Sequence, residues 1–373
     1  MSSHESLPTT QTALKVTRSE HLEVSKDVAL PSLGRSEMLV RVACVSINQV
    51  DTKSADLSPM LGATGGTDFS GVLVALGSDV DGDQWHIGDR VMGGIFGNNP
   101  LRPDNGAFAE YVVIPTRLAW HIPPNMDFAT AASLPAAIAT VGLSLFQYMQ
   151  IPMPKATGPL QLERGKGSSP TYILVYGGGT ATGAMALQVL KLLGFTPIAT
   201  CSATSEARSI ELGAVATFDY HSSECGAEIL NYTAGTLGLA LDCISNSESM
   251  AICYKAFGPA GGQYVALDPF PLRGHTRRSI KPDWVCCYTQ FGHDIAWAPP
   301  FDLEARFDDR VCAEAWYMLA QRLLDGGLIV PQPLEVRRGG LAAVSEGMYQ
   351  VRRGLIKGKK LVYPIAELAT KAS

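Results

Sequence analysis

A glycine-rich loop joins a predicted strand to a predicted helix near the middle of the chain. The strand spans Thr171–Tyr176 (TYILVY), the loop is Gly177–Gly183 (GGGTATG), and a helical run, Ala184–Leu193, follows at once. Glycines let the backbone approach a pyrophosphate closely, and unpaired N–H groups at a helix N-terminus bind its negative charge. This order predicts a dinucleotide site, with a purely structural turn as the alternative.

The loop departs from the usual G-x-G-x-x-G spacing. Counted from Gly177 and Gly179, the third glycine position is occupied by Thr182. The hydroxyl groups of Thr180 and Thr182 are therefore candidate donors to phosphate oxygens at the place where the motif lacks glycine.

The second predicted strand of this region, Pro197–Cys201, should end beside the ribose of the nucleotide. An NAD site has Asp or Glu there to bind the 2′-hydroxyl, whereas this chain has Cys201 and Ser202. Small side chains leave room for a 2′-phosphate, and Arg208 lies about one helical turn beyond Thr204. The pattern favours NADPH over NADH, and an ordinary exposed helix position is the alternative interpretation of Arg208.

The elements that position these residues fall into two patterns. From Thr171 to Leu267 strands and helices alternate, which predicts a parallel α/β sheet. Ahead of this region, short runs closed by Gly, Asp or Asn turns predict a barrel-like β domain. These runs are Met38–Ile47, Ser70–Gly77, Arg90–Gly94 and Ala109–Ile114.

The remaining segments connect or follow these regions. We expect a helix over Asp127–Met149 and a Pro- and Gly-rich connection over Ile151–Pro170. Toward the C-terminus we expect a strand near Val285–Gln290 and helices over Val311–Asp325 and Leu341–Arg353.

Composition narrows the class of protein. The 373 residues are 46% apolar and 17% charged, with 30 Lys and Arg against 35 Asp and Glu. Disorder is excluded by the apolar content, and net negative charge makes a nucleic-acid partner improbable. The eight cysteines form no C-x-x-C pair, and no signal or spanning segment is visible. We therefore expect free thiols and a cytoplasmic protein without a membrane contact.

Four short motifs precede the glycine loop in a characteristic order. They are Asn48-x-x-Asp51-x-Lys53, Gly66–Gly71 (GTDFSG), Gly88–Val91 (GDRV) and Gly106–Tyr111 (GAFAEY). In this order the chain resembles the medium-chain dehydrogenase/reductase superfamily over about residues 30–365.

A closer resemblance rests on shorter segments around the glycine loop. Ala199–Ser202 (ATCS), Phe218–Tyr220 (FDY), Asp242–Ile244 (DCI) and Pro269–Pro271 (PFP) are similar to fungal stand-alone enoyl reductases. Those enzymes act in trans for highly reducing polyketide synthases, as in the lovastatin pathway.

The resemblance implies an α/β fold with a GroES-like β-rich catalytic domain and a Rossmann doubly wound parallel sheet. The expected domains are 1–145 (GroES-like, first part), 146–325 (Rossmann, NADPH-binding) and 326–373 (return to the catalytic domain). It also implies NADPH-dependent reduction, in secondary metabolism, of a polyketide enoyl thioester. The partner would be the acyl-carrier domain of a polyketide synthase, or of a synthase–peptide synthetase hybrid, and the resemblance favours a monomer.

The positions that hold zinc in related alcohol dehydrogenases are occupied differently here. Those enzymes carry a catalytic Cys, a His-Glu pair and a four-Cys lobe. This chain has Asn48 and Asp51 after the first long strand, Thr67-Asp68 at the His-Glu position and no cysteine in Gly93–Gly106. Zinc needs three or four such ligands, so we expect no metal.

Without a metal, reduction of an activated C=C bond requires less of the site than alcohol oxidation does. The site must align the hydride donor and acceptor, stabilise the enolate and allow protonation at the α-carbon. Lys53 is the candidate cation and Thr140 the candidate donor to the carbonyl. A surface lysine and a core threonine are the alternatives, and no α-proton donor is assigned beyond solvent.

The remaining site predictions combine strand-end positions with the resemblance. The predicted cofactor-binding residues are Val50, Asp51, Thr52, Lys53, Gly179, Thr180, Ala181, Thr182, Ser202, Ala203, Thr204, Ser205, Tyr220, Leu267, Asp268, Ile356 and Lys357. The predicted substrate-binding residues are Val141, Gly142, Leu143, Ser144, Leu145, Phe146, Gln147, Tyr148, Val285, Cys286, Cys287, Tyr288 and Thr289.

Two basic clusters are candidates for contact with an acidic carrier domain, although solvated surface is the simpler interpretation. They are His275–Arg278 with Lys281, and Arg352-Arg353 with Lys357, Lys359 and Lys360. Two rival functions also remain: a free-standing NADPH-dependent reductase of enals or quinones, and a non-catalytic NADPH-binding scaffold of the synthase.

Overall fold

The computed structural model describes residues 7–161 and 170–366, which form two compact units. The first unit holds the described parts of 1–136, 294–304 and 333–373, and the second holds those of 137–293 and 305–332. The second unit is thus inserted into the first along the chain. Its boundaries differ from the expected 145/146 and 325/326, and the segment 294–304 belongs to the first unit.

The first unit is built on a seven-stranded, mostly antiparallel sheet. Its order is β14-β15-β3-β4-β5-β7, and β6 pairs with β3. The strands are β3 (Glu37–Ser46), β4 (Asp68–Leu76), β5 (Arg90–Gly94), β6 (Tyr111–Pro115), β7 (Ala119–His121), β14 (Leu334–Val336) and β15 (Lys360–Pro364). β14 pairs with β15 in parallel, and β15 pairs with β3 in antiparallel register. The two C-terminal strands therefore form one edge of this sheet.

A hairpin and three helices complete this unit. The hairpin, β1 (Thr10–Arg18) and β2 (His21–Ala29), was not predicted, because β2 is mostly exposed and shows little apolar alternation. The helices are α1 (Gln49–Leu57), α2 (Phe128–Ala132) and α9 (Gly340–Arg352), and a short 3-10 turn, η1, covers Thr116–Leu118.

The single helix expected over Asp127–Met149 is wrong, because the segment is divided into three. α2 ends at Ala132, α3 spans Pro135–Gly142, and a π-helix, η2, spans Leu143–Tyr148. Proline lacks an N–H group and disfavours helical backbone in the residue before it, so Pro135 starts a new helix. The side chain of Asp127 accepts the N–H of Thr130 at 2.6 Å and thereby starts α2.

The second unit contains a six-stranded parallel sheet in the order β10-β9-β8-β11-β12-β13. In chain order this is 3-2-1-4-5-6, the arrangement of doubly wound nucleotide-binding folds. The strands are β8 (Tyr172–Tyr176), β9 (Thr196–Cys201), β10 (Thr217–Asp219), β11 (Leu239–Asp242), β12 (Gly262–Ala266) and β13 (Ile280–Trp284). The helices are α4 (Ala181–Leu192), α5 (Ala203–Glu211), α6 (Cys225–Tyr232), α7 (Ser247–Ala256) and α8 (Phe307–Asp325), with a 3-10 turn, η3, at Leu272–Gly274.

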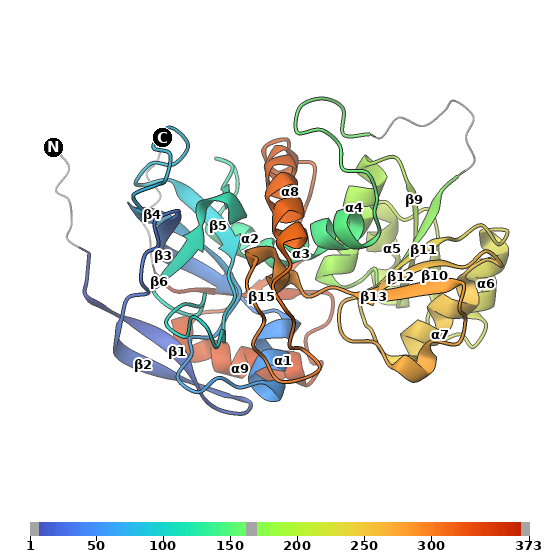
Figure 1. The fold of residues 1–373 in the computed structure, drawn as a ribbon. Helices are drawn as coiled ribbons and strands as arrows, with labels where there is room; N and C mark the ends of the chain where they lie inside the picture. The colour runs from blue at the N-terminus through green and yellow to red at the C-terminus, as the bar shows by residue number, and fades with distance from the viewer. Residues whose placement is uncertain (1–6, 162–169, 367–373) are drawn as a thin grey trace. The chain divides into compact units, whose positions relative to one another are not determined.

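Helices α6 and α7 lie side by side against this sheet (Figure 1). Ile229 of α6 and Met250 of α7 are fully buried in one cluster with Leu174 and Tyr264 of the strands. The central strand β8 is buried along most of its length, as expected for a parallel strand covered on both faces.

The strand expected near Val285–Gln290 is also wrong. The strand is β13, which ends at Trp284, and Cys287–Phe291 forms a 3-10 helix, η4. β13 contains Pro282, which an edge strand tolerates because one side of it needs no ladder hydrogen bond. The apolar character of 285–290 reflects burial against α8 rather than membership of the sheet.

Candidate functional site

The glycine loop follows β8 and leads directly into α4. The hydroxyl of Thr180 accepts the N–H of Gly183 at 3.0 Å and donates to the carbonyl of Gly177 at 2.8 Å. Thr180 is thus the N-cap of α4, and this role occupies the hydroxyl that was predicted to donate to phosphate. Ala181 and Thr182 stand in the first turn, where N–H groups have no acceptor within an α-helix.

Glycine is required at three places around this turn. A Cβ atom at Gly183 would lie 2.2 Å from the carbonyl oxygen of Gly177, and one at Gly178 would lie 2.8 Å from the Cβ of Ala199. Gly177 itself has a φ of +87°, which L-residues rarely adopt. The glycine that allows close packing of helix and loop is therefore Gly183, one residue beyond the third glycine position of the motif, which Thr182 occupies.

Ser202 and Tyr220 leave neighbouring strands at the same edge of the sheet. In the register of β9 and β10, Cys201 lies opposite Asp219. Ser202 follows Cys201 and Tyr220 follows Asp219 along the chain. The Ser202 hydroxyl is 2.9 Å from that of Thr204, and Tyr220 is 38% exposed with its ring 4.1 Å from the His221 ring.

Arg208 is engaged elsewhere in the second unit. Its guanidinium donates to the carbonyl of Pro331 at 3.0 Å and to the carboxylate of Glu211 at 3.2 Å. These contacts give Arg208 a structural role, and its side chain is only 33% exposed, so it is not the ordinary exposed helix position of the alternative interpretation.

A buried carboxylate organises the loops after β11 and β12. Asp242 is fully buried and accepts hydrogen bonds from the hydroxyls of Ser249 (2.5 Å) and Tyr264 (2.7 Å) and from the N–H of Ser245 (2.9 Å). Burial raises the pKa of Asp242, although these hydrogen bonds oppose the shift. The Ser245 hydroxyl in turn accepts the N–H of Leu267 at 2.8 Å, which fixes the first residue of the predicted Leu267-Asp268 pair.

In the first unit, the predicted segment Val50–Lys53 forms the start of α1. Asp51 is 5% exposed and accepts the N–H of Asn48 at 2.7 Å and the hydroxyl of Thr67 at 2.6 Å. Burial raises the pKa of Asp51 to about 7, while these two hydrogen bonds work in the opposite direction. Lys53, the predicted catalytic cation, is half-buried on the same helix.

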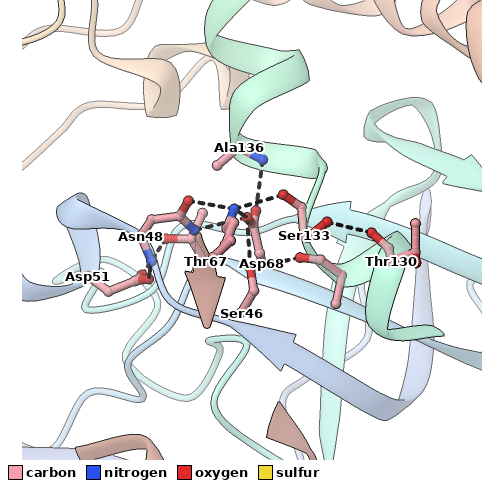
Figure 2. Close-up of polar contacts among 10 residues, drawn as sticks. Ser46, Asn48, Asp51, Thr67, Asp68, Thr130, Ser133 and Ala136 are labelled. Carbon is pink, nitrogen blue, oxygen red and sulfur yellow. Dashed lines mark hydrogen bonds and ion pairs between the residues drawn. The ribbon is translucent and has the colours of Figure 1, made fainter. Parts of the chain in front are cut away.

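A second carboxylate, Asp68, lies at the centre of a buried polar network in this unit (Figure 2). The ammonium group of Lys360 donates to Asp68 at 2.7 Å, to the side-chain oxygen of Asn48 at 2.9 Å and to the carbonyl of Ser133 at 2.9 Å. The side chains of Lys360 and Asp68 are only 5% and 0% exposed.

Sequence analysis placed Lys360 in a basic cluster and did not identify this pair. One signal was available: both residues border apolar strand sequences, where a charge must be paired if it is buried. The rest of the C-terminal cluster differs, since Lys359 is exposed and Arg352 pairs with Asp56 at 2.7 Å.

The basic residue Arg277 of the other cluster also has a structural role. Its guanidinium donates to the carbonyls of Tyr254, Phe257 and Gly258 at 2.9, 3.0 and 2.7 Å. Arg277 therefore donates hydrogen bonds to the carbonyl groups at the C-terminal end of α7. Its guanidinium is occupied within the protein and does not serve as a contact for a carrier domain.

The predicted substrate segments are mostly buried in the second unit. In 141–148 only Gln147 is not buried, and Gly142 packs so closely on Trp316 that a Cβ would lie 2.0 Å from its ring. Thr140 is 8% exposed, and its carbonyl accepts the hydroxyl of Ser144 at 2.7 Å. The other segment, 285–289, runs into η4, with Val285, Tyr288 and Thr289 buried.

The two substrate segments meet at a residue that sequence reasoning missed. Asp309 of α8 is 2% exposed and accepts the hydroxyls of Tyr148 (3.0 Å) and Thr289 (2.5 Å). Arg306 donates to the same Tyr148 hydroxyl at 2.5 Å. A pocket of about 540 Å³ lies beside this group, and its lining includes Tyr148, Gln147, Gln263, Asp283, Arg306 and Asp309.

Neither metal ligands nor membrane spans were found in the part of the chain that the structure describes. Within residues 7–161 and 170–366, no three His, Cys, Asp or Glu side chains cluster in a way that could hold a metal ion. None of the helices in these ranges is both long and apolar enough to cross a bilayer. All eight cysteines are free.

Comparison with known proteins identifies the class that this fold and loop define. A family model described as "Alcohol dehydrogenase GroES-like domain" matches residues 34–124. The fold is similar to that of an alcohol dehydrogenase superfamily protein from Novosphingobium aromaticivorans, with a TM-score of 0.73 at 19% identity over 96% of this chain and 100% of that one. The matched domain and the shared fold confirm the predicted fold class, a GroES-like domain with a Rossmann sheet.

Two fungal proteins are much more similar in sequence. Trans-enoyl reductase iccB of Talaromyces variabilis is 62% identical over 96% of this chain and 97% of its own length. Trans-enoyl reductase iliB of Neonectria sp. (strain DH2) is 60% identical over 97% of this chain and 98% of its own. The chain belongs to the trans-enoyl reductase family, and the predicted resemblance is confirmed.

Proposed function

We propose that this protein is a trans-acting enoyl reductase that uses NADPH to reduce an α,β-unsaturated polyketide thioester. A partner polyketide synthase, or a synthase–peptide synthetase hybrid, carries this substrate on its acyl-carrier domain. The observation that carries the proposal is 62% identity to a trans-enoyl reductase over 96% of the chain. The dinucleotide-type loop after β8 supports it independently.

The residues of the loop fit a dinucleotide. Any side chain at Gly178 or Gly183 would collide with Ala199 or with the carbonyl of Gly177, so glycine at both positions lets the loop pack tightly against β9 and the start of α4. The first-turn N–H groups of Ala181 and Thr182 bind the pyrophosphate, and Gly179 and Thr180 shape the loop around it. Ser202 and Tyr220 contact the 2′-phosphate, with Ala203, Thr204 and Ser205 at the start of α5 beside them.

When bound, NADPH supplies the hydride that reduces the β-carbon. The chain's own residues stabilise the negative charge that develops on the thioester oxygen: Lys53 through its ammonium group and Thr140 through its hydroxyl. No side chain is assigned as the donor of the α-proton, and solvent is the candidate donor. Val50, Asp51, Thr52, Leu267, Asp268, Ile356 and Lys357 complete the cofactor site.

The substrate walls are the two segments that meet at Asp309. Val141–Tyr148 and Val285–Thr289 border the acyl chain, and their apolar side chains exclude water from it. Asp309 holds the ends of both segments together, because the Tyr148 and Thr289 hydroxyls donate to it.

Steady-state kinetics with two substrates test this proposal. We expect a pantetheine-linked enoyl chain to be reduced with a kcat/KM at least about tenfold above that of a small enal or quinone, because remote binding energy is used at the reacting centre. Equal rates would favour a free-standing enal or quinone reductase.

We further propose that the enzyme works as a monomer in the cytosol. The eight free cysteines support a reducing compartment. Light scattering of the purified protein at micromolar concentration tests the oligomeric state, and a dimer mass would contradict this part of the proposal.

A further inference from the structure

The Lys360–Asp68 pair satisfies every polar atom that it buries. Lys360 uses its three N–H donors on Asp68, Asn48 and Ser133. Asp68 also accepts the side-chain N–H of Asn48 at 2.9 Å and the hydroxyl of Ser46 at 3.3 Å on one oxygen. Its other oxygen accepts the backbone N–H of Ala136 at 2.8 Å.

Such a pair contributes little net stability. Moving two charges out of water offsets most of their mutual attraction, and apolar replacements of buried pairs are often neutral or stabilising. A buried ion pair with complete hydrogen bonding is therefore better explained by the geometry that it imposes than by the free energy of unfolding.

The hydrogen bonds of the pair end on the two helices that carry the proposed catalytic residues. Asn48, which contacts both charges, is the N-cap residue of α1, and Lys53 follows on that helix. Ala136 lies in the first turn of α3, and Thr140 stands four residues further along the same helix.

We propose that Lys360 and Asp68 are positioning residues that orient α1, and with it Lys53, for enoyl reduction. This inference rests on the catalytic assignment of Lys53 made above. Neither residue of the pair touches substrate in this account, and Lys360 acts through Asn48. Since the two residues are 292 positions apart, the pair also makes the orientation of α1 depend on the C-terminal strand β15.

The nearby carboxylate of Asp51 responds to the same pair. Burial and hydrogen bonds have the largest effects on the pKa of Asp51. Two charges have smaller effects: the negative charge of Asp68 raises this pKa, and the positive charge of Lys360 lowers it. Replacing Lys360 by a neutral residue should therefore raise the pKa of Asp51, a readout that needs neither cofactor nor substrate.

The test compares Lys360→Met with Lys359→Met in the full-length protein. Lys359 is the neighbouring residue, and its side chain is 56% exposed with a 3.7 Å contact to Glu335. In the ligand-free protein we expect Lys360→Met to accelerate amide hydrogen exchange in α1 at least about tenfold, without a change in β8–β11. We expect the Lys359→Met protein to exchange like the wild type.

A double-mutant cycle then tests whether the faster hydrogen exchange in α1 affects catalysis through Lys53. Lys360→Met should lower kcat at saturating NADPH and enoyl thioester by about tenfold or more, because small misplacements of a catalytic group have large effects on rate. In a Lys53→Ala background the same substitution should lower kcat less than about twofold. If Lys360→Met does not fold, Asp68→Asn/Lys360→Met removes both charges, and the same results are expected of it.

Two outcomes would overturn the inference. Unchanged exchange in α1, or additive losses of kcat in the cycle, would remove the positioning role while leaving the catalytic assignment of Lys53 intact. A Lys53→Ala enzyme with wild-type kcat would instead remove that assignment, and the inference with it.

Discussion

Tyr148 and Thr289 donate hydrogen bonds to the same atom, Oδ2 of Asp309, at 3.0 and 2.5 Å. They belong to two segments that are far apart along the chain and that were predicted separately as substrate walls. One buried carboxylate thus joins the π-helix η2 to the 3-10 helix η4, and both to α8.

Removing this carboxylate should destabilise the second unit. Asp309→Ala removes the acceptor of the buried Tyr148 hydroxyl and leaves Thr289 with only the carbonyl of Cys286 at 2.8 Å. Hydrogen bonds to charged groups contribute about 1.5–3 kcal/mol each. We expect the free energy of unfolding to fall by about 3 kcal/mol in urea titrations. The exposed neighbour Asp308 provides the control, since Asp308→Ala should change it by less than about 0.5 kcal/mol. Equal effects of the two substitutions would contradict the structural role of Asp309.

Asp51 makes stability depend on pH. Its pKa of about 7 in the folded protein lies above the ordinary value of 3.8, so the folded state retains a proton that the unfolded state has lost. The contribution of the protonated Asp51 to the free energy of unfolding is complete below pH 3.8 and is lost as the pH rises toward 7. Asp51→Asn mimics the protonated form, and we expect this variant to match the wild type near pH 4 and to be more stable at pH 8.

Urea unfolding of both proteins between pH 4 and pH 8 measures this difference. Asp79→Asn is a control of opposite sign, because the hydrogen bond from Arg35 lowers the pKa of Asp79. The stabilisation by ionised Asp79 is therefore present at neutral pH and lost on acidification. Parallel pH profiles for the wild type and Asp51→Asn would contradict the raised pKa.

Gly183 should tolerate no side chain. In Gly183→Ala the new Cβ lies 2.2 Å from the carbonyl oxygen of Gly177, a backbone atom that can move only with the loop. We expect a loss of about 1–3 kcal/mol in the free energy of unfolding and a higher Kd for NADPH in fluorescence titrations. Gly82→Ala is the matched control, since no heavy atom lies within 4 Å of its Cβ. Wild-type cofactor affinity in Gly183→Ala would show that the loop does not bind the pyrophosphate.

Ser202 and Tyr220 should determine the preference for NADPH. If both contact the 2′-phosphate, Ser202→Ala and Tyr220→Ala each remove an interaction with a charged group. We then expect the Kd for NADPH to rise about tenfold more than that for NADH. Thr236→Ala, which only loses a hydroxyl bonded to the carbonyl of Thr233, is the control and should leave both constants unchanged. Equal losses for the two cofactors in isothermal titration would remove the 2′-phosphate assignment.

The parallel sheet and its phosphate loop were predictable because their signals are local. The run Thr171–Tyr176, the glycines after it and the following helix lie within about twenty residues, and β8, β9, β11 and β12 each carry their own apolar pattern. The handedness of β-α-β crossovers does not by itself select the strand order, since several doubly wound orders share it.

Features that depend on distant contacts were not predictable in this way. Lys360 and Asp68 are 292 positions apart, and Tyr148 and Asp309 are 161 apart, so no spacing rule relates them. The apolar run 285–290 was interpreted as a strand because short buried segments look alike in sequence, whereas packing against α8 decides its conformation. Pro135 was a local signal for a break between two helices, and the prediction of a single helix over Asp127–Met149 did not use it.

Reconstitution with a carrier-bound enoyl thioester and NADPH deuterated at C4 of the nicotinamide tests the central claim most directly. The account predicts that one deuterium appears at the β-carbon of the saturated product, read by mass spectrometry, and that the carrier-bound substrate outcompetes a small enal. An unreduced thioester, or a product without deuterium at the β-carbon, would contradict it.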